Sequence, residues 1–301
     1  MLSCRYISRK YGKQYGIAAL LVFGLFACVK NSGQKSEPDN ETGKMNYSIS
    51  NGQLRLKIDP EIGGRVASLQ VKGQEVLKTS RDDEHLQWGS TVWPAPQKAW
   101  NWPPPPVLDQ QAYEIIDRDK DYIIVRSKED PQTNLQITKE FRFGGENQIV
   151  VKYFFRNTGN DTLNVGIWEN TRVPFGGQCF VPAMQEEIDE PLVKHASGYA
   201  GISFNQQLQK PNKLQISGYK GRMVYLNDRV VFIKKFDHLP SGRIAPDQSL
   251  IEIYYDQPDQ FVELEVHGAY SKLNPGQIQS MELIWELHLL SDPSEIKQFL
   301  N

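Results

Sequence analysis

Acidic and imidazole side chains recur at alternate positions in a short segment near the C-terminal end of the chain. In residues 261–267, Glu263, Glu265 and His267 alternate with apolar residues. Because successive side chains of a β-strand point to opposite faces, these three polar groups should share one face. Crowded carboxylates raise one another's pKa, and a histidine beside them is held in its charged form. The spacing therefore predicts side chains that can give and take protons.

A second segment, residues 280–290, repeats this pattern, with Glu282, Glu286 and His288 opposite an apolar face. The link between the segments, residues 268–279, contains an Asn-Pro-Gly turn and is short enough for them to pair antiparallel. We therefore expect one merged polar face that could act as acid and base. A solvated sheet face with cross-strand ion pairs is the alternative interpretation.

A further carboxylate and a guanidinium lie in the sequence WENTR, residues 168–172. Glu169 is a candidate base, and Arg172, three residues later, falls on the other side of a regular strand. An arginine fork suits a uronic acid carboxylate or vicinal hydroxyls, and an ion pair at the strand end is the alternative. If Glu169 is the base, Glu169→Gln should abolish turnover and leave binding nearly intact.

Tryptophan is concentrated in residues 88–102, WGSTVWPAPQKAWNW, which hold four of the six tryptophans of the chain. Six prolines lie between positions 94 and 106. Because proline is excluded from helix interiors and central strands, we expect a rigid loop here. Trp93, Trp100 and Trp102 are candidates to stack on a sugar ring. Alternatively, the tryptophans plug the end of a β-sandwich.

Long strands are needed to position these side chains, and strand patterns recur along the chain. We expect strands at 48–58 (a hairpin around Asn-Gly), 65–71, 74–77, 113–116, 122–126, 135–143, 148–156, 162–173, 222–224, 230–236, 250–255, 261–267 and 280–290. A short helix should occupy 293–300, capped by Asp292. The pattern predicts an all-β fold, a sandwich of two large antiparallel sheets.

The first 27 residues have the features of a signal peptide. A basic start is followed by the apolar run IAALLVFGLFA at 17–27, which is too short to span a bilayer. The sequence Leu-Phe-Ala-Cys at 25–28 resembles a bacterial lipobox, which would make Cys28 the lipidated N-terminus of the mature protein. An ordinary signal peptide or an uncleaved anchor is the alternative. Residues 28–45 are polar and are expected to form a flexible tether, followed by one domain at 46–301.

A lipid anchor at Cys28 would hold the protein on a membrane without a span. Val29 stands where an aspartate would favour retention in the inner membrane. By resemblance to Gram-negative lipoproteins, we therefore expect a cell-envelope location at the outer membrane.

Composition narrows the classes of partner. Removing residues 1–27 takes away four of the 34 basic residues and none of the 36 acidic ones, so the mature net charge is 30 − 36 = −6. With no basic stripe, we expect no nucleic acid partner. No phosphate loop and no metal-ligand spacing is present, so no metal or cofactor is predicted. Cys179 is the unpaired cysteine that remains and is expected to be buried and inert.

Several motifs together resemble the galactose mutarotase-like superfamily. The segments IGGRVASL at 62–69 and GQEVL at 73–77 resemble the opening of proteins in this superfamily. The segments ELEVH at 263–267 and LNPGQ at 273–277, with a final strand that contains Trp285, resemble their C-terminal end. WPAPQ at 93–97, with the tryptophans and prolines that follow, is similar to one subfamily of bacterial, often lipidated, proteins known as a domain of unknown function. The resemblance covers nearly the whole mature chain.

The resemblance implies a supersandwich whose concave face binds carbohydrate. Aldose-epimerase members of the superfamily open and close the sugar ring with two histidines and a late glutamate. Here the turn NTGN at 157–160 places Glu169 near one histidine position, and the tryptophan segment occupies the region of the other, with His85 nearby. The late glutamate falls among Glu263, Glu265 and Glu282. Because these histidines are missing, the epimerase machinery is not visible in the sequence.

Two functions follow as hypotheses. In the first, the protein binds carbohydrate through Trp93, Gln97, Trp100, Trp102, Arg172 and His85, and acts on the sugar with Glu169, Glu263, Glu265 or His267. Such an enzyme would be an epimerase, or a lyase or hydrolase of glycans. In the second, it is a non-enzymatic envelope lipoprotein that grips a protein partner with the aromatic segment.

Overall fold

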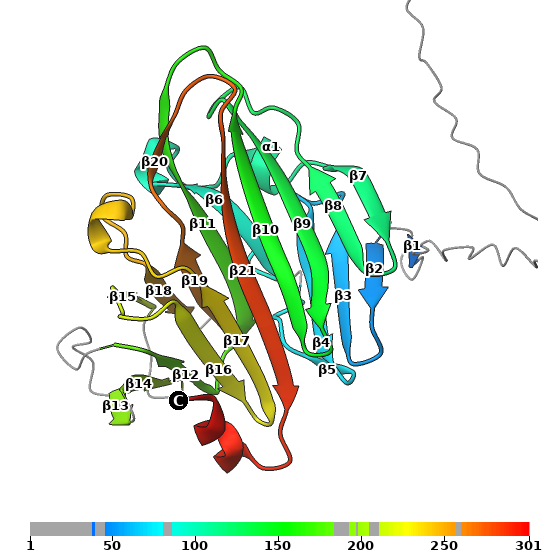
Figure 1. Ribbon diagram of the computed structural model, residues 1–301, viewed down its shortest axis with the longest axis vertical. Coiled ribbons are helices and arrows are strands. Elements are labelled where there is room, and N and C mark those ends of the chain that lie inside the picture. The colour runs from blue at the N-terminus through cyan, green and yellow to red at the C-terminus, as the bar shows by residue number, and fades with distance from the viewer. Residues whose placement is uncertain are drawn as a thin grey trace, which may run out of the picture. The chain divides into compact units, whose positions relative to one another are not determined.

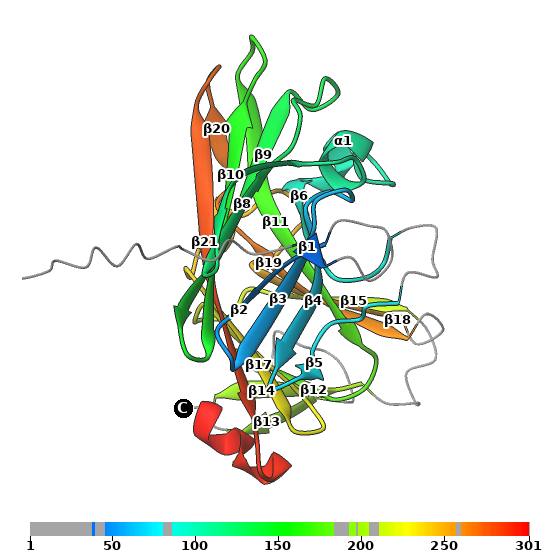
Figure 2. The same ribbon diagram turned by 90° about the vertical axis from the view of Figure 1, so that its right-hand side faces the viewer.

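The computed structural model describes residues 38–39, 46–80, 86–183, 193–196, 198–204, 211–256 and 260–300. In these residues the chain folds as two antiparallel sheets packed face to face, drawn from two directions in Figures 1 and 2. The predicted all-β sandwich is therefore confirmed. Cys28 and His85 lie outside the described residues, so what the sequence predicts for them stays a prediction.

The first sheet has eleven strands among the described residues. In order across it lie β1 (Pro38–Asp39), β2 (Asn46–Ser50), β3 (Leu54–Asp59), β4 (Arg65–Val71), β6 (Ser90–Ala95), β11 (Leu163–Pro174), β19 (Phe261–His267), β18 (Ile251–Asp256) and β15 (Asn212–Ile216). The short strands β5 (Gln74–Glu75) and β20 (Ser271–Leu273) pair with β4 and β11. Although β1 falls in the predicted tether, its backbone pairs with β2.

The second sheet has ten strands in the described part of the chain. In order they are β13 (Val193–Ala196), β14 (Tyr199–Ser203), β12 (Gln178–Val181), β16 (Arg222–Asn227), β17 (Val230–Phe236), β21 (Ile278–Leu289), β10 (Gln148–Asn157), β9 (Leu135–Gly145), β8 (Tyr122–Arg126) and β7 (Glu114–Asp119).

Helical segments are short. In the part of the chain that the structure describes they are α1 (Pro106–Asp109) and the 3-10 turns η1 (Gln97–Ala99), η3 (Ser241–Arg243) and η4 (Pro293–Phe299). The predicted C-terminal helix is thus a 3-10 helix, and its predicted cap is present because Ser294 N–H donates to Asp292 Oδ1 at 2.8 Å. Within the described residues, no helix is both long and apolar enough to cross a membrane.

Alternating apolar residues fill the space between the sheets. On β19 the core-facing residues are Val262, Leu264 and Val266, and on β21 they include Leu283 and Trp285, all at most 1% exposed. Burying an apolar side chain of this size contributes about 1.5–3 kcal/mol. The same alternation turns the charged residues of β19 to the outer face of the first sheet, away from the core.

The expected pairing of residues 261–267 with 280–290 is wrong. β19 lies between β11 and β18 in the first sheet, whereas β21 lies between β17 and β10 in the second. The link contains β20, which pairs with β11 at residues 163–165, and the chain then crosses to the other sheet. Glu282 and Glu286 are therefore in a different sheet from Glu263, and no merged polar face forms.

The tryptophan segment is not entirely a loop, because Ser90–Ala95 forms strand β6 with Pro94 inside it. Along its whole length β6 pairs with β11, but β4 pairs with it only at Val66–Ser90. Residues beyond Ser90 thus have one neighbouring strand instead of two. Proline is tolerated at such a sheet edge, where its missing N–H costs no ladder hydrogen bond.

Candidate functional site

Five neighbouring strands of the first sheet, β6, β11, β19, β18 and β15, carry polar and aromatic side chains on one face. The strand register aligns them in three rows. The rows are Trp93–Trp168–His267, Thr91–Asn170–Glu265–Glu252–Gln215 and Arg172–Glu263–Tyr254–Lys213. Because period-two alternation selects every second residue of each strand, all of these side chains share the outer face.

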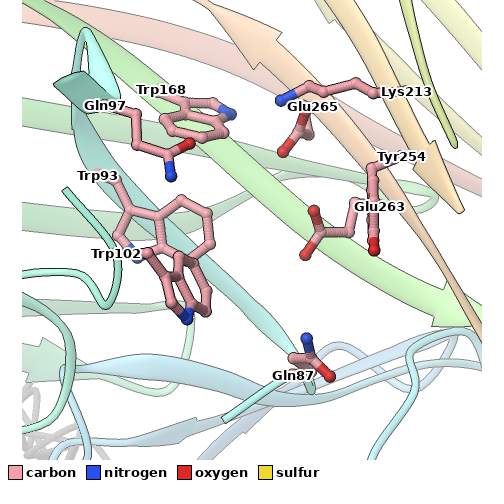
Figure 3. Close-up of a pocket in the computed structure, with 9 residues that line it drawn as sticks. All are labelled: Gln87, Trp93, Gln97, Trp102, Trp168, Lys213, Tyr254, Glu263 and Glu265. Carbon is pink, nitrogen blue, oxygen red and sulfur yellow. Dashed lines mark ion pairs between the residues drawn. The ribbon is translucent and has the colours of Figure 1, made fainter. Parts of the chain in front are cut away.

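A cavity of about 310 Å³ opens on this face. Its lining residues, shown in Figure 3, are Gln87, Trp93, Gln97, Trp102, Trp168, Lys213, Tyr254, Glu263 and Glu265. Three indole rings stand on one side, and two carboxylates face them from the other (Figure 3). Volume and lining are those of a small-molecule site, in which apolar walls carry a few placed polar groups.

The aromatic side is one packed unit. The ring of Trp93 meets those of Trp168 and Trp102 edge to face, with centroids 5.0 and 5.9 Å apart. Trp93 and Trp168 are buried, while Trp102 is 43% exposed at the mouth of the cavity. In the described residues the buried Nε1 of Trp168 has no hydrogen-bond partner. The wall thus offers apolar ring faces and an unused N–H donor.

The tryptophan wall is held in place by Asp109 at the end of α1. Its Oδ1 accepts hydrogen bonds from Trp93 Nε1 at 2.9 Å, Thr91 Oγ1 at 3.0 Å and Arg65 Nη2 at 2.7 Å. Although burial by itself raises the pKa of Asp109, the Arg65 guanidinium and the Trp93 bond bring it below its usual value. Gly63, at φ +65°, allows the backbone of Asp109 to lie close against it, since a Cβ at position 63 would be 2.2 Å from the Asp109 carbonyl oxygen.

Lys213 links two carboxylates at the opposite side of the cavity. Its Nζ lies 2.6 Å from Glu252 Oε2 and 2.9 Å from Glu265 Oε2. Asn170 Nδ2 donates to Glu265 Oε1 at 2.9 Å, and His267 Nε2 lies 3.3 Å from Glu252 Oε2. The His267 ring in turn stacks on Trp168 at 5.4 Å. The carboxylates are therefore fixed by neighbours on every adjacent strand.

These surroundings push the pKa values of the two carboxyls in opposite directions. Burial raises the pKa of Glu265 well above its usual range, Lys213 opposes this, and the Glu263 and Glu252 charges add to it. Burial also acts to raise the pKa of Glu252, but the bond from His267 and the Lys213 charge lower it to about 2. A pair separated in this way supplies a proton donor beside a permanent carboxylate.

Glu263 has its own counter-ion. Arg172 Nε and Nη2 lie 2.8 and 2.7 Å from Glu263 Oε1, and the guanidinium stands 5.1 Å from the centre of the Trp93 ring. Arg172 is fully buried behind the lining residues, so it acts on the cavity through Glu263. Both contacts of Arg172 are with Oε1, and Glu263 itself lines the cavity, where its carboxylate can meet a ligand.

Glu252, Glu265 and His267 are close enough for one ion, since a ligand atom of each lies within 4.8 Å of the others. Lys213 Nζ already contacts both carboxylates at the distances of charge-assisted hydrogen bonds. An ammonium therefore occupies the place of a cation, and a metal could be held here only if Lys213 moved away.

Comparison with known families identifies the chain. A family model described as a domain of unknown function (DUF4380) matches residues 85–288, more than half of the sequence. The chain belongs to this family. The matched range contains every residue of the cavity lining. No curated protein sequence matches the chain.

Solved structures resemble this DUF4380 chain in fold. A galactose mutarotase related enzyme from Lactobacillus acidophilus matches with a TM-score of 0.57 at 12% identity, covering 82% of this chain and 99% of that one. A galactose mutarotase-like protein from Lactobacillus casei gives 0.57 at 11%, covering 81% and 100%. The GalM/aldose epimerase homologue from C. elegans gives 0.55 at 12%, covering 82% and 100%. The predicted galactose mutarotase-like sandwich is confirmed, and at these identities the likeness shows the fold alone.

Five of the residues predicted from sequence line the cavity: Trp93, Gln97, Trp102, Glu263 and Glu265. Two more, Arg172 and His267, lie on the same face behind the lining. Trp100 is buried beside the cavity, where its Nε1 donates to the Pro94 carbonyl at 2.7 Å. The functional roles of all these residues stay predictions.

Glu169 lies on the opposite face of β11. Its carboxylate faces the second sheet, where Lys234 Nζ approaches Oε2 to 2.6 Å. As expected, Glu169 and Arg172 point to opposite sides of the strand, but Arg172 is the one on the cavity face. Direct contact between Glu169 and a sugar in the cavity would require a path through the sheet.

Sequence reasoning missed four lining residues: Gln87, Trp168, Lys213 and Tyr254. Two signals were present. Trp168 lies an even number of residues from Arg172 on β11 and therefore on the same face of the strand, and Tyr254 alternates with the apolar residues of β18. Lys213 gave no such signal, because β15 was not recognised as a strand.

Proposed function

We propose that this protein binds carbohydrate in the cavity, with a sugar ring between the tryptophans and the carboxylates. The observation that carries the proposal is the position of Glu263 and Glu265 opposite Trp93 and Trp102 (Figure 3). A sugar ring has an apolar face, which packs on indole rings, and hydroxyl groups at its edge, which bind carboxylates and amides. One cavity supplies both.

The same geometry supports acid–base chemistry on the bound sugar. Because burial raises the pKa of Glu265 well above its usual range, this side chain is suited to act as the proton donor. Glu263, paired with Arg172, is the acceptor that the proposal requires. Both line the cavity, so a proton can leave one part of the ring and return at another.

On a free aldose, these roles amount to exchange of the anomers. Glu265 would give its proton to the ring oxygen while Glu263 takes the proton of the anomeric hydroxyl. The bond between C1 and the ring oxygen then breaks and an aldehyde forms. Reclosure on the other face of the aldehyde returns both protons and yields the other anomer. His267 does not line the cavity. It contacts Glu252, which Lys213 links to Glu265, and so helps to position Glu265.

NMR exchange spectroscopy between α and β anomers tests the proposal, with a panel of free aldoses and uronic acids and the protein from residue 45 onward. Saturation transfer from protein to sugar in the same samples reports binding separately. We expect both, with exchange lost and saturation transfer kept in Glu265→Gln and Glu263→Gln. Glu282→Gln, an exposed carboxylate on β21 that pairs with Lys152, is the matched control.

Each outcome has a distinct meaning. Saturation transfer without exchange would limit the protein to binding, or to a reaction elsewhere on a glycan. The absence of both accelerated exchange and saturation transfer would overturn the carbohydrate proposal. It would then favour a protein partner gripped through Trp102, the exposed member of the aromatic segment.

We further propose that Cys28 carries a lipid that anchors the domain at the outer membrane of the cell envelope. The support is the sequence alone: the lipobox-like residues 25–28 and the polar stretch that follows. Such an anchor would hold the cavity close to a membrane surface.

A further inference from the structure

A second cavity of about 270 Å³ adjoins the proposed sugar cavity. Gln97 of η1 and Lys213 of β15 line both cavities, so the two meet between these residues. In Figure 3 the Gln97 amide and the Lys213 ammonium stand on opposite sides of the upper end of the first cavity. A ligand too long for the first cavity would therefore continue between them into the second.

The lining of the second cavity suits a polyhydroxylated unit. Pro96 and Pro246 supply flat apolar surface, while the side chains of Gln215 and Gln248 supply amides, which both donate and accept hydrogen bonds as sugar hydroxyls do. Gln215 Nε2 donates hydrogen bonds to Glu252 Oε1 at 3.1 Å and to the Asp247 carbonyl at 2.9 Å. Among the described residues, the buried Oε1 of Gln248 has no hydrogen-bond partner.

An ion pair joins the two loops beside this cavity. Lys98 Nζ of η1 lies 2.6 Å from Asp247 Oδ2, and both residues line the second cavity. Their side chains are mostly exposed, and surface ion pairs of this kind contribute little to stability. A ligand can therefore exchange this contact for its own hydrogen bonds without disturbing the fold.

We infer that the two cavities are adjacent subsites of one groove and that the natural ligand is an oligosaccharide of at least two units. One ring packs against Trp93 and Trp102, and the next passes between Gln97 and Lys213 to meet Gln248. This inference rests on the proposed function, because it extends the same cavity. It moves the substrate class from free monosaccharides to chains.

Isothermal titration of monosaccharides against their disaccharides tests it, with glucose, galactose, mannose and xylose and their 1,4-linked dimers as probes. We expect the dimer of the preferred sugar to bind about tenfold tighter or more, because the second ring adds hydrogen bonds and buried area. Gln248→Ala and Asp247→Asn should bring the dimer close to the affinity of the monomer without changing monomer binding. Trp102→Ala should weaken both ligands alike.

The outcomes separate this inference from the proposed function. A sugar that binds equally as monomer and dimer, with no effect of Gln248→Ala on the dimer, would overturn the second subsite and leave the sugar cavity standing. No binding by any probe would overturn both. Thermal unfolding of each variant checks that lost affinity does not come from lost fold.

Discussion

Lys234 on β17 donates to both carboxylate oxygens of Glu169 on β11, at 2.9 and 2.6 Å. Both side chains are buried between the two sheets. Lys234 Nζ also donates to the Leu264 carbonyl of β19 at 2.6 Å, so one ammonium holds two strands of the facing sheet. Burial lowers the pKa of Lys234, and the Glu169 charge opposes that shift. The ion pair thus joins the sheets directly behind the cavity.

Breaking this pair should cost stability rather than binding chemistry. We expect Lys234→Met to lower the free energy of unfolding by about 3–5 kcal/mol, because it leaves the Glu169 charge buried without a partner. The double variant Lys234→Met, Glu169→Leu should recover much of the loss. Urea unfolding measures both variants. If a Glu169→Gln variant kept the wild-type stability but lost turnover, Glu169 would instead have a role in catalysis.

Removing the exposed ring of the aromatic wall should weaken sugar binding and leave the fold intact. For Trp102→Ala we expect affinity to fall about tenfold, which corresponds to about 1.4 kcal/mol. Stability should change by no more than about 0.5 kcal/mol, since the Trp102 side chain is 43% exposed. Titration of intrinsic fluorescence measures the affinity. Tyr219→Ala, an exposed aromatic outside the cavity lining, is the control, and equal losses in both variants would argue against the wall.

Asp109 should prove essential to the position of the tryptophans. Asp109→Asn removes the carboxylate charge that lies 2.7 Å from the buried Arg65 guanidinium, so we expect a loss of about 3–5 kcal/mol in the free energy of unfolding. Asp130→Asn is a matched control, because Asp130 is a buried aspartate whose Oδ2 accepts from Thr133 rather than from a cation. Similar losses at both positions would show that the Arg65 pair carries no special weight.

The opposite pKa shifts of Glu265 and Glu252 predict opposite effects of pH on stability. Glu265 has a folded pKa above its usual 4.5, so it favours the folded state at low pH, and this contribution is lost as the pH rises through the folded pKa. Glu252, at about 2, contributes stability above pH 4.5 that is lost as the pH falls towards 2.

Urea midpoints measured from acid to alkaline pH check these signs. Glu265→Gln should flatten the decline above pH 4.5, and Glu252→Gln should flatten the decline below it. Glu282→Gln, on the other sheet, should keep the wild-type profile. If Glu265→Gln left the alkaline side unchanged, the raised pKa of Glu265 would be wrong.

Lipidation is testable in the cell. In a Gram-negative host fed with labelled palmitate, the wild-type chain should take up label and partition with outer membranes. Cys28→Ala should lose both the label and the membrane fraction, because no second attachment is proposed. Label that persists in Cys28→Ala would place the modification elsewhere.

Local alternation in the sequence was enough to predict which residues of a strand share a face. Glu263, Glu265 and His267 do lie together on β19, because the period of two is a property of the strand itself. The same reasoning assigned the strand beside them wrongly. Which strands become neighbours depends on where the chain turns, and β20 redirects it to the second sheet.

The sequence by itself determined the all-β class, most of the strands and the residues that alternate on each, since these depend on neighbours along the chain. Only the tertiary structure decided which faces meet. It brought Lys213 to Glu252 and Glu265, set Trp168 beside Trp93, and turned Glu169 inward to Lys234. Such contacts join residues far apart in the sequence, and they depend on strand order, which the alternation along a single strand does not specify.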